Sequence, residues 1–279
     1  MRPYRPANPS DPRRRRLPSA HTVLLALGAL VLAPVACGDD PTGPNGTTDP
    51  DSDGDEPYAH DLAPGASAHD LLADDTFEHL IVQIQYIEGA EPTDEGLTHL
   101  EEFLEARLNK PGGIELRKDD APIASGSGPT YGAADVRDLE EEHRTVYTSG
   151  DTLAAYLVFL DGEHEQENVL GIAYNNTSTA IFGEKIREHT GGTFEPDRSM
   201  VEGTVANHEF GHIMGLVNNG TEMQEPHQDE DNGHHCDVDS CLMYFSVRTT
   251  DFLDNLVGSD EPPDLDRSCL DDLAANGGK

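Results

Sequence analysis

Residues 208–215 read HEFGHIMG, in which two histidines lie four positions apart and a glutamate directly follows the first. Positions i and i+4 of a helix lie one turn apart on the same face. His208 and His212 can therefore bind one Zn²⁺ ion through their imidazole nitrogens. Glu209 is displaced around the helix from that row, and its carboxylate can instead take a proton from a zinc-bound water. The spacing predicts a catalytic zinc site.

The neighbouring residues favour such a site over two surface histidines on an ordinary helix. Residues 199–216 form one predicted helix, with Ser199 as its N-cap. Glu202 stands three positions later, where its side chain can reach back to the cap. Gly215 follows the second histidine by three positions.

The HExxHxxG pattern of residues 208–215 resembles the metzincin clan of zinc peptidases. In that clan a third His or Asp ligand follows the glycine by three positions. Asn218 occupies this position here and is a poor zinc ligand. The third ligand must therefore come from elsewhere in the chain.

Residues 235–243 read HCDVDSCLM, and this HC-x4-C-x-M string resembles the archaemetzincins. The resemblance implies that His235 is the third zinc ligand. It also implies that Met243 is the Met-turn residue, whose side chain forms an apolar floor beneath the metal. Residues 218–234 would then be an insertion between the helix and the third ligand.

Several other donors compete for the third position. They are His227, His234 and the acidic residues Glu225 and Glu230. An acidic third ligand would make the site similar to that of gluzincins, in which the downstream glutamate lies on a helix. The polar segment 221–235 is interrupted by Pro226 and does not predict that helix.

Archaemetzincins also carry a later CxxC pair, which completes a second, four-cysteine zinc site. No CxxC follows residue 243 here, so the sequence favours one catalytic zinc ion and no second zinc. Cys236 and Cys241 are expected to pair as a short disulfide, or one of them to pair with Cys269. Three cysteines downstream of Cys37 leave one thiol unpaired.

The resemblance implies a zinc-dependent endopeptidase that acts on proteins or peptides, with Glu209 as the general base on the zinc-bound water. Its substrate would lie extended along an exposed strand edge, for which residues 178–182 are the candidate. One alternative is a gluzincin-type peptidase. The other is a surface-anchored binding or adhesion protein, whose structural zinc would be closed by His234, Cys236 or Cys241.

The predicted elements form a mixed α+β fold. Apolar patterns predict strands at residues 79–87, 113–118, 151–162, 168–176 and 178–186, and helices at 92–113 and about 134–146. The expected result is a twisted sheet packed by helices. By resemblance, the active-site helix is followed by a Met-turn and a C-terminal helix.

The N-terminus has the pattern of an export signal. Arginines precede a short apolar stretch within residues 1–36, and the stretch ends in PVAC. This resembles a bacterial lipoprotein signal, which implies lipidation at Cys37 and a location in the cell envelope. Residues 37–75 are predicted to be an acidic tether rich in Gly, Pro and Asp, and residues 76–279 the catalytic domain.

The charge balance limits the possible partners. The chain has 54 acidic residues against 18 lysines and arginines, and a formal net charge of −36. Nucleic acids and anionic membrane surfaces are bound through basic patches, so neither is an expected partner. The predicted membrane contact is the lipid anchor alone. Aspartates at 229, 231, 237 and 239 could bind Ca²⁺, although solvated loop charges are the favoured interpretation.

Overall fold

The computed structural model describes residues 57–126, 130–259 and 261–279, all of which belong to one compact unit that begins at residue 54. The predicted signal segment, the lipidation candidate Cys37 and the tether as far as residue 56 lie outside the described residues. Within the described part of the chain, no helix is both long and apolar enough to span a bilayer.

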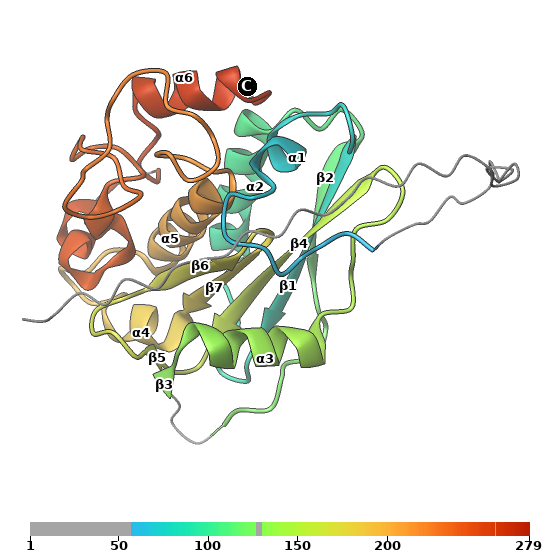
Figure 1. Ribbon diagram of the computed structural model, residues 1–279. Coiled ribbons are helices and arrows are strands. Elements are labelled where there is room, and N and C mark those ends of the chain that lie inside the picture. The colour runs from blue at the N-terminus through green and yellow to red at the C-terminus, as the bar shows by residue number, and fades with distance from the viewer. Residues whose placement is uncertain (1–56, 127–129, 260) are drawn as a thin grey trace, which may run out of the picture. The chain divides into compact units, whose positions relative to one another are not determined.

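A twisted five-stranded sheet forms the centre of the fold (Figure 1). Its strands are β1 (His79–Tyr86), β2 (Gly113–Lys118), β4 (Thr152–Leu160), β6 (Gly171–Asn175) and β7 (Ser178–Phe182), in the order β2-β1-β4-β7-β6. Only β6 runs antiparallel to its neighbour in this sheet. The mixed sheet packed by helices confirms the predicted α+β class.

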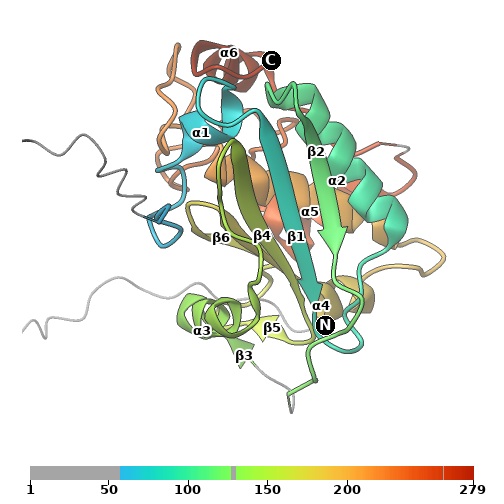
Figure 2. The same ribbon diagram turned by 90° about the vertical axis from the view of Figure 1, so that its right-hand side faces the viewer.

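The sheet has one hydrophobic core on each face, and the central strand β4 contributes side chains to both. It is buried from Leu153 to Leu160, as expected for a continuous apolar run in a parallel sheet that is covered on both faces. Leu157 faces α2 (Asp94–Arg107) and α5 (Arg198–Ile213), whereas Tyr156 and Val158 face α3 (Ala133–His143). Figures 1 and 2 show these helices on opposite faces of the sheet.

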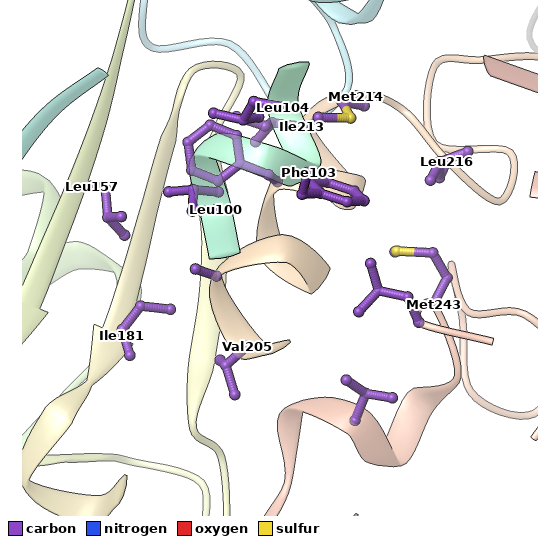
Figure 3. Close-up of a cluster of buried hydrophobic side chains, with 14 of the residues drawn as sticks. Leu100, Phe103, Leu104, Leu157, Ile181, Val205, Ile213, Met214, Leu216 and Met243 are labelled. Atoms are coloured by element: carbon purple, nitrogen blue, oxygen red, sulfur yellow. The ribbon is translucent and has the colours of Figure 1, made fainter. Parts of the chain in front are cut away.

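The larger core joins the sheet to α2 and α5. Figure 3 shows Leu157 of β4 and Ile181 of β7 facing Leu100 of α2 and Val205 of α5. All the residues of α5 from Ser199 to Ile213 are buried. Because this helix carries the HExxH residues, the candidate site lies on a helix that is buried along almost its whole length.

The first turn of α5 differs from the prediction. Asp197 is the N-cap, and its carboxylate accepts from the Ser199 amide. Glu202 does not reach back to the cap, because its carboxylate accepts from the amide and hydroxyl of Thr93, the N-cap of α2. It also pairs with Arg198. Glu202 thus links the starts of two packed helices.

Part of the predicted tether packs on the domain. Within residues 57–75, the short helix α1 (Ala68–Leu72) buries Leu71 and Leu72 completely. Lys110 donates to the carbonyls of Asp70, Ala73 and Phe77, which fixes the turn after the helix. The described fold therefore begins well before the predicted boundary at residue 76.

The remaining elements complete the layers. They are β3 (Thr130–Tyr131), β5 (Glu163–His164), α4 (Gly183–Glu188), the 3-10 helices η1 (Phe245–Arg248) and η2 (Thr250–Leu256), and α6 (Arg267–Ala275). β3 and β5 pair as a small parallel sheet. The predicted strand 178–186 ends at Phe182, after which α4 begins.

Candidate metal centre and active-site cavity

Three histidines converge at the C-terminal half of α5. His208 and His212 lie one turn apart on this helix, and His235 approaches from the loop that follows it. One donor atom of each lies within 4.8 Å of the others. The ring centroids are 4.8–5.3 Å apart, and all three side chains are buried.

Backbone carbonyls orient two of the three rings. His208 Nδ1 donates to the Leu242 carbonyl at 2.7 Å, and His235 Nδ1 donates to the Asn232 carbonyl at 2.6 Å. A carbonyl only accepts, so Nδ1 carries the proton and Nε2 presents its lone pair. Both of these Nε2 atoms are buried without a hydrogen-bond partner. They therefore fit a metal ion that takes lone pairs.

Burial also keeps these imidazoles neutral. It lowers the pKa of His208 and His212 well below the usual histidine range, and that of His235 to about 4. A metal competes with protons for the same lone pairs, so neutral imidazoles are ready to bind. The residues present match a zinc site at neutral pH.

Glu209 is buried beside the histidines, and its two carboxylate oxygens have no hydrogen-bond partner. Burial raises the pKa of Glu209 to about 7, while the positive charge of Arg248 and the Ala173 backbone act in the opposite direction. Space for this carboxylate depends on Gly171 of β6, where a Cβ would lie 2.9 Å from Glu209 Cγ. The carboxylate is thus placed for proton transfer near neutral pH.

Met243 packs against α5 at Gly211, the residue before His212. It is fully buried, and Figure 3 shows it reaching the core from the side opposite the sheet. A Cβ at Gly211 would lie 2.3 Å from Met243 Sδ, so only glycine lets the sulfur approach the helix this closely. The Met243 carbonyl accepts from the Cys236 amide at 2.8 Å. This bond connects Met243 to the residue that follows His235.

An open cavity of about 400 Å³ lies over Glu209, His212 and His235. Its other walls are Ala63, Pro64, Ala173, Asn219, Asn232, Gly233, His234 and Arg248. Ala173 belongs to β6, the edge strand of the sheet. The candidate edge at residues 178–182 was therefore wrong, because these residues form β7, which lies between β4 and β6.

Arg248 is the site residue that the sequence did not indicate. It ends η1 and lines the cavity with Glu209. Its charge contributes to the lowered pKa of each of the three histidines. No motif precedes it, and only the fold after Met243 brings it to the cavity.

The competing third ligands do not belong to the group of His208, His212 and His235. Glu225 and Glu230 are exposed, and His234 Nδ1 donates to the Val217 carbonyl at 3.1 Å. Among the described residues, no carboxylate or cysteine joins the group formed by His208, His212 and His235. Neither the gluzincin pattern nor a site closed by a fourth protein ligand matches this geometry.

The cysteines differ from the predicted disulfide. Cys236, Cys241 and Cys269 are buried free thiols. Cys241 Sγ and Cys269 Sγ are 3.7 Å apart, well beyond the bond length of about 2.05 Å. His227 lies beside them, and His227, Cys236 and Cys269 belong to a second group of possible metal ligands.

The aspartates considered for calcium lie in the loop around His235. Asp229 accepts from the Asp231 amide and from Asn232 Nδ2, so its carboxylate stabilises the loop itself. A calcium site at these residues stays a prediction.

Comparisons with known proteins complete the description of the site. No protein-family model matches the chain, and no curated protein matches it. Among solved structures, the chain is similar to an archaemetzincin from Methanopyrus kandleri, with a TM-score of 0.46 and 18% sequence identity. The match covers 71% of this chain and 96% of the other.

Proposed function

We propose that this protein is a zinc-dependent metallopeptidase that cleaves peptide bonds within proteins or peptides. One observation carries the proposal: three histidine donors converge beside an unpartnered, buried Glu209, and Glu209, His212 and His235 line one open cavity. A structural zinc site is closed by four protein ligands and needs no adjacent carboxylate, whereas a catalytic site keeps a position open.

The side chains divide the chemistry between them. His208, His212 and His235 would hold the metal, which when bound supplies a Lewis acid that activates water and polarises a carbonyl. Glu209 accepts a proton from the attacking water and returns it to the leaving amine. A pKa of about 7 suits both transfers, because the group exchanges a proton readily near neutral pH.

The edge strand β6 is the proposed substrate-binding edge. One end of it is paired, since the Leu170 amide donates to the Arg248 carbonyl at 2.8 Å and Val169 bridges Thr249. Beyond Leu170, β6 has no further strand on its outer side within the described residues. An extended peptide could add to this edge next to Ala173 and present a carbonyl above Glu209.

The test is cleavage of a mixed peptide library by the purified protein and its Glu209→Gln variant, with zinc content measured in both. We expect the wild type to cut, the variant to be inactive and both to hold zinc. The exposed Glu225→Gln is the matched control and should cut normally. Equal cleavage by the wild type and Glu209→Gln, or zinc-loaded wild type that cuts no peptide, would contradict the proposal.

We also propose that the protein is exported and anchored by a lipid on Cys37, as its N-terminal sequence pattern suggests. Metabolic labelling with a radioactive fatty acid tests this. Label on the wild type and none on Cys37→Ser supports the anchor, and label that persists on Cys37→Ser contradicts it.

A further inference from the structure

The wall of the active-site cavity carries one arginine whose charge the rest of the fold does not neutralise. Arg248 is half-buried and lines the cavity together with Glu209, His212 and His235. Among the described residues, no carboxylate oxygen lies within 4.0 Å of its guanidinium nitrogens. We propose that Arg248 binds a carboxylate of the substrate, so that the peptidase prefers a negative charge beside the bond it cuts. This inference rests on the proposed peptidase function and names its substrate class.

The free guanidinium is unusual in so acidic a chain, in which acidic residues outnumber lysine and arginine by 54 to 18. Five of the other described arginines pair with a carboxylate at 2.5–2.9 Å, namely Arg107, Arg117, Arg144, Arg198 and Arg267. Arg137 donates to Asn175 Oδ1 and to the Tyr174 carbonyl. Arg187 also has no ion pair among the described residues, but it does not line this cavity. Arg248 is therefore the described arginine that is available to an anion entering the active site.

The backbone around Arg248 is fixed, so its side chain starts from a defined position. The Leu170 amide donates to the Arg248 carbonyl at 2.8 Å, and the Thr250 amide donates to the Asn168 carbonyl at 3.1 Å. The preceding residue, Val247, is buried. These contacts attach both sides of Arg248 to the segment that leads into β6, the proposed substrate-binding edge. Such preorganisation lowers the entropy cost of binding a ligand through a long side chain.

Glu209 does not use the charge of Arg248. Both Glu209 carboxylate oxygens are without a hydrogen-bond partner, although the two side chains line the same cavity. Apart from Glu209, the residues that line the cavity include no carboxylate. An anionic substrate group would be repelled by Glu209 if no cation were present, and Arg248 supplies that cation without occupying the general base.

A guanidinium favours a carboxylate over other substrate groups. Its planar N–H groups can donate two parallel hydrogen bonds to the two oxygens of one carboxylate. A neutral amide side chain of similar shape can accept only through one oxygen and carries no charge. A hydrogen bond between charged partners in a partly enclosed site corresponds to about 10–100-fold in binding. We expect discrimination of that size between Glu and Gln at the same substrate position.

Two parts of a peptide can supply the carboxylate. One is the side chain of an Asp or Glu residue close to the cleaved bond, and the other is the free C-terminus of a short peptide. Both present the same group to Arg248, and the substrates of the test distinguish them.

The first test compares three peptides built around one bond that the purified protein cuts. Two have amidated C-termini and differ only in Glu or Gln, placed in turn on either side of the cleaved bond. The third has Gln and a free C-terminus one residue beyond that bond. Cleavage is measured at a pH of about 8.5, above the pKa of about 7 of Glu209, so that the general base is unprotonated in every variant.

The wild type should cut the Glu peptide or the free-terminus peptide with a kcat/KM about 10–100-fold above that of the amidated Gln peptide. The peptide that is favoured identifies the source of the carboxylate. Equal kcat/KM values for all three would overturn this inference and leave the proposed peptidase function intact. A zinc-loaded wild type that cuts none of them would contradict the proposed function, and this inference with it.

Variants then show whether Arg248 is the cause of the preference. Arg248→Gln should lose about 10–100-fold on the favoured peptide and far less on the amidated Gln peptide, and Arg248→Lys should keep part of the preference. Arg248→Glu should shift the preference to a Lys residue at the same position. The exposed Arg267→Gln is the control and should leave all ratios unchanged. Zinc content and melting temperature check that each variant is folded.

Equal losses in Arg248→Gln on the favoured and the neutral peptide would overturn the proposal. That result would indicate that Arg248 acts on a group common to all peptides, such as the carbonyl of the cleaved bond. A preference that persists in folded Arg248→Gln would also overturn it, because another group would then bind the carboxylate.

Discussion

Two groups of side chains that could hold a metal ion lie next to each other in this protein, one under an open cavity and one in the closed interior. His235 belongs to the group beneath an open cavity, and Cys236 belongs to the buried group without one. The first has three neutral donors and a carboxylate that binds nothing. The second is formed by His227, Cys236, Asp266 and Cys269, and a further carboxylate, Asp272, pairs with its histidine. The open set suits the chemistry proposed for it, because a catalytic site keeps one metal position free.

The largest expected effect is the difference in kcat/KM between variants of Glu209 and Asp272. Glu209→Gln should lower kcat/KM by about 10²–10⁴-fold, because the general base is lost while the ligands remain. Asp272→Asn should reduce kcat/KM far less, since Asp272 lies beside the closed group. Steady-state cleavage of one identified peptide measures both. Equal losses in the two variants would show that the open and closed sites do not have separate roles.

The next effect concerns stability. Cys269→Ser should lower the free energy of unfolding by about 1–3 kcal/mol, because it places a more polar hydroxyl at a fully buried position. His212→Ala should cost less, because His212 lies at the rim of an open cavity and its removal leaves the thiol group intact. Urea unfolding in buffered zinc measures both. A larger loss for His212→Ala would contradict the expectation that the closed group contributes more to stability.

A smaller effect on stability tests the packing of Met243 against α5. Gly211→Ala should destabilise the protein by about 1–3 kcal/mol, because the new Cβ would overlap Met243 Sδ. Gly183→Ala is the control, since its Cβ would meet neighbours at 3.4 Å or more. Thermal unfolding of both variants checks this, and similar melting temperatures would mean that Met243 moves aside without cost.

The smallest effect concerns pH. Arg248 opposes the raised pKa of Glu209, so Arg248→Gln should raise that pKa further. A base must be unprotonated to act, and the acid limb of the kcat/KM profile should therefore move to higher pH. On that limb the loss should be less than about tenfold, the factor that corresponds to one pKa unit. The exposed Arg267→Gln should leave the profile in place.

The sequence predicted the elements whose signal is local. The buried strand β4 has a continuous apolar run, and the HExxH helix shows its ligands through spacing alone. The N-cap was misplaced by two residues because Asp197 and Ser199 can both accept from helix amides, and Glu202 has a tertiary partner in Thr93. Local sequence patterns do not show which of two possible residues caps a helix, or which side chains have tertiary partners.

Features that depend on distant contacts were not predictable. The strand order that puts β6 at the edge follows from its antiparallel return, which no local pattern specifies. Residues 57–75 have the composition of a linker, yet Leu71 and Leu72 enter the core. Arg248 and the grouping of His227 with Cys269 arise only when the C-terminal third of the chain folds back over α5.

Because α5 is almost completely buried, its two histidines should release a bound metal more slowly than His235. His208 and His212 stand on the most protected helix, and His235 stands on a loop whose neighbours at 231–234 are exposed. Backbone amides of the helix should therefore exchange with deuterium slowly, and those of the loop quickly. Zinc would leave the catalytic position by release of His235 first, so the lifetime of the bound metal would be set by the loop.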